Sequence, residues 1–586
     1  MKYPTLASPQ TSRDMVDVFG GYNHNLRIGV GEFYDMTNLS SSAYPVLSPR
    51  PKRGVYVRGT YVHEGRIMTP SGMIAKDALC YVDGPDFVIN EYRVPMGLTL
   101  DSTKTLVSMG AYVIIMPDKK YINTADLSDY GDIEANVTTS SYTVFSLCKN
   151  DGTSYEDAFI QSEAPTDPQN MDLWIDTSST PHSLKQYSSN SAMWVPIATT
   201  YIKIASTGIG KPFSEGDGVT ISGVESASLS DLNSNMIIWA RDDNYIVVTG
   251  ILDYIITQNS PVTVSRLMPN MDFIIESENR LWGCRYGTAL NGDVVNEIYA
   301  CKLGDFKNWN CFAGVSTDSY AATVGTDGQF TGAIAHLGYP LFFKETCIHK
   351  VYGNFPANYQ IQTTNCRGVQ KGSERSLAIV NEMLYYKSSL GVCAYDGSLP
   401  VEMSSALGDV MYGNAAAGAL GNKYYISMQD ASGVYHLFVY DAIKGMWHKE
   451  DNTHALAFCT CRGELYYTEH GSNQINTIMG SGITDATPVS WMAETGVIGT
   501  DSPDKKYISR MDVRLSLELG ATVMMFIQYD SFGEWELLHT MTGTTLRSFC
   551  IPIRPKRCDH LRLRMVGQGT AKIFSICKTV EQGSDV

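Results

Sequence analysis

The chain has 586 residues, too many for one hydrophobic core, so roughly three to five structural units are expected. It contains 51 Gly and 35 Tyr, only 18% charged residues, and a formal net charge of −16. This balance is typical of a β-rich protein and argues against tight nucleic-acid binding, which depends on clustered Lys and Arg.

Neither secretion nor membrane insertion is expected. Residues 1–4 do not begin a signal peptide, and no apolar run approaches the roughly 18 residues of a membrane span. The 13 cysteines are odd in number and scattered, and most lie in apolar strands. We therefore expect reduced, buried thiols in a protein made in the cytosol. The strand cysteines are Cys284, Cys301, Cys347, Cys393, Cys550 and Cys577.

Residues 1–60 are predicted to be an extended N-terminal arm. Prolines at 45, 49 and 51 disfavour a central strand and favour a segment that lies along another surface. That surface is either a neighbouring subunit or the chain's own propeller. Arg50, Lys52 and Arg53 could contact phosphate, although a short solvated basic turn is the favoured interpretation.

Residues 61–147 are predicted to hold the first propeller strands. Residues 78–85 and 110–118 are apolar runs that end in Gly or Pro turns, typical of short antiparallel strands. They supply either two blades or one blade and a closing half. Because a propeller ring closes by pairing strands from both ends of the chain, this segment should join the later blades.

Two inserted modules are predicted next: a small module containing Trp and Tyr over residues 148–202, and a small β-barrel over 203–265. Trp174, Tyr187 and Trp194 allow a sugar-stacking hypothesis, because aromatic rings suit carbohydrate faces. A small domain with few aliphatic residues also needs such rings as its core, and this second interpretation is favoured.

Residues 266–489 are predicted to form the main propeller blades. A turn followed by an apolar, aromatic strand recurs, and its turn residues Gly338, Asn381, Gly421 and Gly463 are spaced by 43, 40 and 42 residues. This is the period of a four-stranded blade, and the helical periodicity of a helix-hairpin repeat is missing from the sequence.

A C-terminal β-sandwich is predicted over residues 490–586, where the period ends and alternating strands follow. Arg514, Arg562 and Arg564 could together form a polar sheet that faces a partner, although a solvated face is favoured. The predicted fold class is therefore all-β, with a β-propeller core, an inserted small β-barrel-like module and a C-terminal β-sandwich.

The sequence carries no recognised catalytic, cofactor-binding or metal-binding motif. Cys459 and Cys461 with nearby His454 come closest to a metal site, but buried thiols are favoured because no second ligand pair follows. A glycosidase would need two carboxylates across a cleft, and the sequence alone does not pair any. We therefore predict no catalytic, cofactor or metal residues and no enzyme. The candidate acids are Asp86, Glu278, Glu345 and Glu382.

Several strand motifs resemble the propeller core of bacteriophage tail nozzle proteins. They are Asn279-Arg280-Leu281-Trp282, residues 303–309 with the sequence LGDFKNW, and the segments 296–301, 317–319, 334–338, 341–344 and 351–353. Residues 35–39, leading into 45–50 and Gly54, resemble the opening of that family. The resemblance implies a structural virion protein of the tail, made in the host bacterial cytoplasm. It also implies a homo-oligomeric ring, a hexamer or dodecamer, below the portal and adaptor, next to tail fibre or tail-tip proteins, with DNA passing through without specific binding.

Two other functions stay open at this stage. One is a phage receptor-binding or tail-tip propeller that recognises a host surface glycan through Trp174, Tyr187 and Trp194. The other is a propeller glycosidase or sialidase. The acidic composition suits the conduit, because a negative wall repels phosphate.

Overall fold

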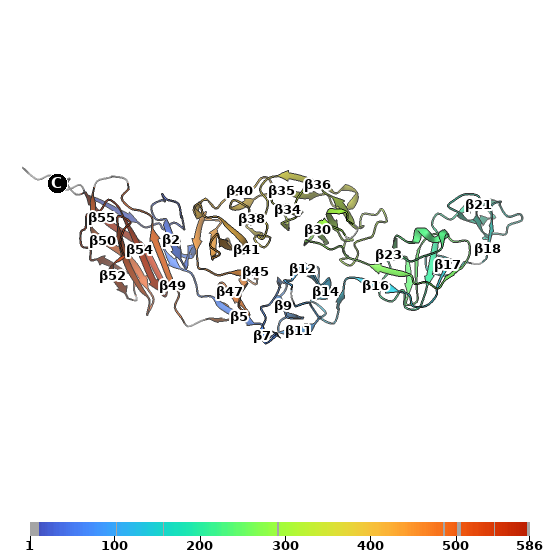
Figure 1. Ribbon diagram of the computed structural model, residues 1–586, viewed down its shortest axis with the longest axis horizontal. Helices are drawn as coiled ribbons and strands as arrows, with labels where there is room; N and C mark the ends of the chain where they lie inside the picture. The colour runs from blue at the N-terminus through green and yellow to red at the C-terminus, as the bar shows by residue number, and fades with distance from the viewer. Residues whose placement is uncertain are drawn as a thin grey trace, which may run out of the picture.

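The computed structural model describes residues 11–100, 102–155, 157–289, 292–484, 487–500, 505–543 and 545–582. Its modules follow one another along one long axis: a sandwich, a propeller, and a barrel that carries a smaller sheet at the far end (Figure 1). This architecture confirms the predicted all-β fold class with its propeller core, inserted barrel and C-terminal sandwich. The described 3-10 helices are η1 (Ser41–Ala43), η2 (Ala227–Leu232), η3 (Pro356–Asn358) and η4 (Ser405–Leu407).

The described residues form seven propeller blades, each an antiparallel sheet. The first two are β8 (Met73–Ala75), β9 (Leu79–Asp83), β10 (Asp86–Ile89), β11 (Tyr92–Pro95), and β12 (Thr105–Met109), β13 (Tyr112–Met116), β14 (Lys120–Asn123), β15 (Tyr130–Asp132). The next two are β29 (Phe273–Ser277), β30 (Arg280–Thr288), β31 (Val294–Ala300), β32 (Tyr320–Thr323), and β33 (Gly332–His336), β34 (Tyr339–Lys344), β35 (Cys347–Tyr352), β36 (Gln360–Asn365). The fifth and sixth are β37 (Ala378–Val380), β38 (Met383–Lys387), β39 (Val392–Tyr395), β40 (Val401–Glu402), and β41 (Tyr412–Leu420), β42 (Lys423–Asp430), β43 (Tyr435–Asp441), β44 (Met446–Lys449). The seventh combines β45 (Ala455–Cys461), β46 (Glu464–Glu469) and β47 (Gln474–Thr477) with β5 (Gly54–Arg58) and β48 (Ile483–Thr484).

The second strand of each repeated unit explains why the sheets stack. Residues 341–343 and 384–386 are buried on consecutive positions, whereas a sheet with one wet face would alternate. Leu341 and Phe343 pack toward Leu384 and Tyr386 of the next blade, while Phe342 packs toward Trp282 of the preceding blade. Similar apolar clusters join every neighbouring pair of blades around the ring.

The ring is closed by a strand from the start of the chain. In the seventh blade β5 pairs antiparallel with β47, with Val57 opposite Ile475 and Gly54 opposite Thr477. The inter-blade cluster that contains Leu79 and Ile475 joins this blade to the first one. The expected pairing of both chain ends is therefore confirmed, and residues 73–132 supply two complete blades.

The insert leaves the propeller after the second blade and returns before the third. Its barrel consists of two sheets, with strands β16 (Ala135–Thr138), β17 (Thr143–Cys148), β22 (Tyr201–Ala205), β23 (Gly218–Ser222), β24 (Asn235–Ile237), β25 (Ala240–Asp242), β26 (Tyr245–Thr249), β27 (Ile256–Gln258) and β28 (Thr263–Arg266). The distal sheet, β18 (Ala158–Gln161), β19 (Leu173–Asp176), β20 (Ser183–Ser188) and β21 (Met193–Pro196), is itself inserted between β17 and β22.

The insert differs from the two consecutive modules predicted over 148–202 and 203–265. Residues 135–147, which the prediction placed with the first blades, contribute barrel strands, and residues 201–202, which it placed in the small module, also belong to the barrel. The reason is pairing over long range: Phe145 of β17 lies opposite Ile204 of β22 and packs in the barrel core. Local composition does not encode such a partner.

The sandwich combines both ends of the chain. One sheet has the order β1 (Thr11–Val16), β55 (Ala571–Gln582), β50 (Lys506–Leu517), β53 (Arg547–Ile551). The other has the order β2 (Phe33–Thr37), β49 (Ser490–Thr495), β54 (Leu561–Gln568), β51 (Thr522–Tyr529), β52 (Glu536–Thr542). Two short ladders, β3 (Leu39–Ser40) with β4 (Ser48–Pro49) and β6 (Val62–His63) with β7 (Arg66–Ile67), complete the described strands.

The segment predicted as an extended arm is thus built into the chain's own modules. Residues 11–16 and 33–37 are sandwich strands, and 54–58 complete the last blade. The described part of residues 1–60 follows the alternative in which the segment packs on its own chain. The first ten residues of the predicted arm lie outside the described residues.

A buried ion-pair cluster fastens this segment to the propeller. Arg53 contacts Glu450 at 2.7 Å and Asp451 at 2.9 Å, and Arg50 contacts the same two carboxylates at 3.5 and 3.3 Å. Each arginine side chain is only 12% exposed. The prediction of a solvated basic turn at Arg50 and Arg53 is therefore wrong, because the tertiary fold places two carboxylates beside them.

Removing Arg53 should destabilise the protein strongly. The change Arg53→Ala removes a cation from the buried carboxylate of Glu450 and the half-buried carboxylate of Asp451, which costs about 3–5 kcal/mol. Arg27→Ala, at an exposed position, serves as the control and should change the unfolding free energy by less than about 0.5 kcal/mol. Denaturant unfolding measures both; equal stability of the two variants would contradict the assignment.

In acid, Arg53→Ala should no longer destabilise the protein relative to wild type. Burial by itself raises the pKa of Asp451, but the guanidinium groups of Arg53 and Arg50 outweigh burial and hold this pKa below its ordinary value. The stabilisation is therefore present above the ordinary pKa, about 3.9, and is lost as the pH falls through the lowered value. The stability gap between wild type and Arg53→Ala should narrow below about pH 4.

Candidate functional site

The structure disperses the candidate carboxylates over different blades. Glu278 and Glu382 lie in the turns between the first and second strands of their blades, whereas Asp86 and Glu345 lie at turns between second and third strands. Successive turns of a meander lie at opposite ends of its sheet, so the two pairs occupy opposite faces of the propeller. Asp86 pairs with Arg93 at 3.2 Å, and Glu345 accepts a hydrogen bond from the Lys371 amide.

The thiols near His454 are protonated and packed. Burial raises the pKa of Cys459 to about 12, with neighbouring thiols adding to the effect, and burial also raises the pKa of Cys461. A thiolate, not a thiol, is the effective metal ligand. The His454 ring stacks instead on Tyr435, 3.5 Å between centroids, and on His470 at 4.8 Å. Among the described residues no group of three His, Cys, Asp or Glu side chains could hold a metal ion.

The cysteines are all free, as expected, but they are not uniformly buried. Cys284, Cys301, Cys347 and Cys393 are buried between blades. Cys577 is half-buried and Cys550 is exposed, because both lie on the outer side of a sandwich sheet, on either side of Asp512. The expectation of a buried thiol is wrong for Cys550.

The three sandwich arginines do not form one surface. Arg514 lies on β50 and donates to the Ser548 hydroxyl, while Arg562 and Arg564 lie on β54 in the opposite sheet. The latter two contact the buried carboxylate of Glu494 at 3.3 and 2.5 Å. Arg564 also covers the Trp535 ring at 4.0 Å. Arg562 and Arg564 therefore fit neither predicted alternative: they do not share a partner-facing sheet with Arg514, and they are not simply solvated.

The motif residues around Arg280 build a loop that supports the insert. Arg280 is 1% exposed and donates to the carbonyl oxygens of Cys301, Ser316 and Asp318 at 2.6 to 2.9 Å. Its guanidinium therefore holds both ends of the loop 301–319. Within that loop the Trp309 indole donates to the Phe306 carbonyl at 2.9 Å.

This loop forms a polar joint with the barrel. Asn308 donates to Asp217 at 2.9 Å and accepts from the Gly218 amide at 2.9 Å, and Asp217 pairs in turn with Arg266. Asp217, Arg266 and Asn308 are all at most 5% exposed. A Cβ on Gly218 would lie 2.7 Å from the Asn310 backbone, so the two modules meet closely here. Sequence reasoning missed this joint, since only Asn308 lies in a recognisable motif.

The three candidate sugar-stacking residues, Trp174, Tyr187 and Trp194, gather on one face of the distal sheet. Trp174 lies directly opposite Lys185, and Tyr187 lies opposite Trp194. The Trp174 and Trp194 rings are 5.5 Å apart in an edge-to-face arrangement, and Tyr187 is 5.3 Å from Trp194. Trp174 is 5% exposed, so this ring is packed, whereas Tyr187 and Trp194 remain half-buried.

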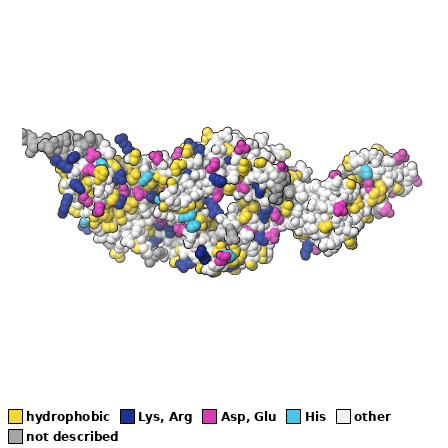
Figure 2. Space-filling view, viewed as in Figure 1, with side chains coloured by type: hydrophobic (Ala, Val, Ile, Leu, Met, Phe, Trp, Pro, Cys, Tyr) yellow, Lys and Arg dark blue, Asp and Glu magenta, His cyan; other side chains and the backbone are white. Residues whose placement is uncertain are grey.

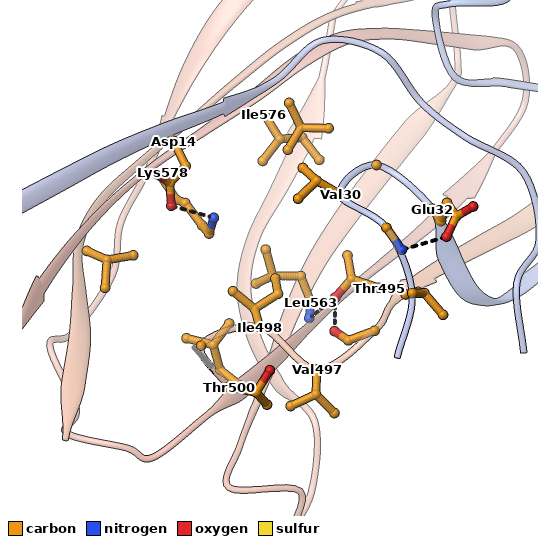
Figure 3. A pocket seen from close by; sticks show the side chains of 18 of the residues that line it. Asp14, Val30, Glu32, Thr495, Val497, Ile498, Thr500, Leu563, Ile576 and Lys578 are labelled. Carbon is orange, nitrogen blue, oxygen red and sulfur yellow. Dashed lines mark hydrogen bonds and ion pairs between the residues drawn. The ribbon is translucent and has the colours of Figure 1, made fainter. Parts of the chain in front are cut away.

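A cavity of about 520 Å³ lies between the two sheets of the sandwich (Figure 3). Its walls include Val16, Ile498, Leu563 and Ile576, and the loop 28–32 covers one side. That loop is fastened by the Gly29 amide, which donates to Glu32 at 2.6 Å. The cavity is mainly apolar, with the Asp14–Lys578 ion pair at its side.

Within the part of the chain that the structure describes, no helix is long and apolar enough to cross a membrane.

Neither a family model nor a curated protein matches the chain. Similar solved structures include an exo-β-1,3-galactanase from Phanerochaete chrysosporium, with 8% identity over 52% of this chain and 94% of that chain and a TM-score of 0.20. PorZ of Porphyromonas gingivalis has 11% identity over 89% and 77%, with a TM-score of 0.25. A Trypanosoma rangeli sialidase has 9% identity over 97% and 96%, with a TM-score of 0.21.

These neighbours correct the prediction that the chain is no enzyme. Glycoside hydrolases and a sialidase are among the structures found similar, and the prediction is not kept. Their TM-scores near 0.2 and identities of 8–9% carry neither an activity nor a substrate over to this chain.

Loss of the Asp217 carboxylate should loosen the barrel joint. Asp217→Ala leaves Arg266 buried without its carboxylate and removes the hydrogen bond from Asn308 to the barrel, at a cost of about 3–5 kcal/mol. Amide hydrogen exchange should rise in residues 216–218 and 302–311 while the sixth blade stays protected. Asp231→Ala, an exposed barrel residue, is the control. Unchanged exchange at both sides of the joint would show that Asp217 does not hold it.

Proposed function

We propose that the protein is a structural component of a bacteriophage tail: a nozzle protein that forms a ring below the portal and adaptor and conducts DNA during ejection. The observation that carries this proposal is the elongated row of modules with buried joints between them (Figure 1). Domains of one chain move relative to each other unless their interface is large or well packed. Here Arg53 ties the N-terminal segment to the end of the sixth blade through Glu450, and the barrel residue Asp217 accepts a hydrogen bond from Asn308 of the propeller in a second buried contact.

One continuous core strengthens the first of these joints. Buried residues of blades five and six, such as Tyr424 and Phe438, belong to the same cluster as Met511 and Val523 of the sandwich. Trp447 in the sixth blade is 2% exposed, and its backbone carbonyl accepts a hydrogen bond from the Tyr22 amide at 2.6 Å. A body that keeps its shape between distant contacts is suited to a repeated subunit of a large assembly.

The motif resemblance supports the same family of function. Residues 279–282 and 303–309, which resemble the nozzle propeller core, supply Arg280 and Asn308 to the joint that positions the insert. In this interpretation the motif has a structural role, because it fixes the position of the insert on the propeller. Such a role is consistent with a virion component.

The charge distribution supports head-to-tail association. Residues 1–60 and 491–586 contain 19 basic and 15 acidic residues, a net charge of +4, whereas residues 61–490 contain 26 and 46, a net charge of −20. Figure 2 shows Lys and Arg side chains prominent over the sandwich, while most charged side chains on the visible face of the insert are acidic. Rings with heterologous contacts need two different, complementary patches on each subunit.

The remaining partners follow from the proposed position. The ring would contact the portal or adaptor on one side and tail fibre or tail-tip proteins on the other, in the virion tail after synthesis in the host cytoplasm. The excess of acidic residues in the propeller and insert would let DNA pass without specific binding, because phosphate affinity depends on clustered cations.

Purified full-length protein should assemble into a ring of six or twelve 64.6 kDa chains. Mass photometry measures the assembled mass, negative-stain microscopy shows the ring, and immunogold labelling locates the protein in phage particles. Because exposed charges are screened over about 10 Å at 0.1 M salt, the ring population should fall as salt rises. Monomers at every concentration, together with absence from particles, would refute the proposal.

Charge reversal on the sandwich tests the association further. Arg510 is 62% exposed, and the change Arg510→Glu with Arg514→Glu should weaken ring assembly at least tenfold in concentration. Arg241→Glu makes the acidic insert more negative and, unlike the sandwich change, should not weaken assembly. Equal effects of both variants would indicate that the sandwich face is not the contact.

A further inference from the structure

The outer face of the distal sheet has a composition that packing does not explain. Leu173, Ile175 and Leu184 point to the inner side, where they pack with Leu147 and Ile251 of the barrel. Side chains alternate between the faces of a strand, so their neighbours Trp174 and Lys185 belong to the other face. A sheet with one packed face ordinarily presents polar residues on the other.

This outer face, called the distal face below, carries two cross-strand rows. The register places Phe159, Trp174, Lys185 and Pro196 opposite one another across the four strands, and Tyr187 opposite Trp194 beside them. Phe159 is 47% exposed, and Tyr187 and Trp194 are half-buried. Phe159, Tyr187 and Trp194 thus reach solvent around the packed Trp174 ring, and together they form an apolar patch of the kind that marks a binding surface.

Packing holds these rings in place. The Trp174 indole donates to the Gln161 carbonyl at 2.9 Å, and Lys185 lies over the Trp174 ring at 4.6 Å. Trp194 meets the packed Trp174 edge-to-face, and its other neighbour is Tyr187. Trp174 therefore acts as the fixed base against which Trp194 and Tyr187 are oriented. Little side-chain entropy remains to be lost when a ligand binds there.

A hydrogen-bonding pair lies within the aromatic patch. Lys185 contacts the Asp176 carboxylate at 2.7 Å, and the other Asp176 oxygen accepts from the Ser178 amide at 2.9 Å. An ammonium group only donates hydrogen bonds and a carboxylate only accepts them. The pair can therefore donate to one ligand hydroxyl group and accept from another. A pyranose ring combines a C–H face that suits an aromatic ring with a rim of hydroxyl groups that suits such a pair.

The charge of the surroundings selects among sugars. Between residues 150 and 202 Lys185 is the single basic residue, against seven acidic residues. The field around the distal face is therefore negative, and it disfavours sialic acids, uronic acids and phosphorylated glycans. It leaves uncharged sugars as the class that meets both the rings and the polar pair.

We propose that the distal face is a binding surface for neutral carbohydrate. It lies at the end of the molecule opposite the sandwich, on a barrel joined to the propeller through Asp217 and Asn308 (Figure 1). In this position it reaches a partner that the propeller does not contact. The inference goes beyond the proposed structural role and does not depend on ring formation.

Affinity electrophoresis of the full-length protein tests the surface. Native gels contain dextran, mannan or arabinogalactan as neutral probes, and polygalacturonate as the anionic comparator. Wild type should be retarded by at least one neutral polysaccharide and not by polygalacturonate. Trp194→Ala and Tyr187→Ala should each weaken retardation at least tenfold, and Trp194→Phe should retain most of it because a ring is preserved.

A matched tryptophan controls for general effects. Trp239 lies on the barrel, is 47% exposed and contacts Tyr201 edge-to-face, so Trp239→Ala removes a comparable surface ring without touching the distal face. Circular dichroism and thermal unfolding verify that each variant is folded. Three results would overturn the proposal: no retardation by any neutral probe, retardation that survives the double change Trp194→Ala and Tyr187→Ala, or retardation by polygalacturonate alone. Self-association lost in Trp194→Ala without sugar binding would instead assign the face to a second copy and also overturn it.

Discussion

The structure depends on blades that must cover each other on both faces. Strands such as 341–343 and 384–386 bury every side chain, so a single sheet of this kind would expose an apolar face to water. Stacking seven sheets in a ring removes that exposure only if the last blade also meets the first. Strand β5 makes this closure possible, and it ties the start of the chain to residues more than 400 positions later.

Closure of the ring has a second consequence, because it buries polar side chains and loop carbonyl groups between the blades. Lys344 and Lys387 occupy the same place at the end of the second strand of neighbouring blades, and both are nearly fully buried. Lys344 donates to the Thr326 carbonyl at 2.6 Å and Lys387 to the Ser388 carbonyl, while Ser427 in the following blade donates to the Thr453 carbonyl at 2.7 Å. Burial lowers the pKa of Lys387 to about 8. A recurring buried donor thus satisfies loop carbonyl groups that the stacked sheets leave without water.

The joints between modules follow the same physical rule. At one joint the Arg53–Glu450 pair is buried, and at the other the Asp217 carboxylate, which pairs with Arg266 inside the barrel, is buried against Asn308 of the propeller. Loss of Arg53 or of Asp217 therefore leaves a buried charge without its partner. Such contacts define one relative orientation, whereas a purely apolar contact tolerates sliding. The result is an extended body with its aromatic distal face at one end and its basic sandwich at the other. Because the two surfaces lie at opposite ends, the sandwich can take part in the proposed assembly while the distal face binds sugar.

The sequence by itself determined the class of fold, because strand length, turn chemistry and the period near 42 residues are local properties that four-stranded blades require. It also singled out Trp174, Tyr187 and Trp194, since aromatic residues stand out in a polar segment. Only the tertiary structure decided which strands pair: that 54–58 closes the ring, that 135–148 belongs to the barrel, and that Arg53 meets two carboxylates instead of water. It likewise placed Trp174 in the packed base and left Trp194 and Tyr187 toward solvent. The physical reason is that cross-strand partners and buried counter-ions are chosen by contacts across hundreds of residues, about which a local pattern carries no information.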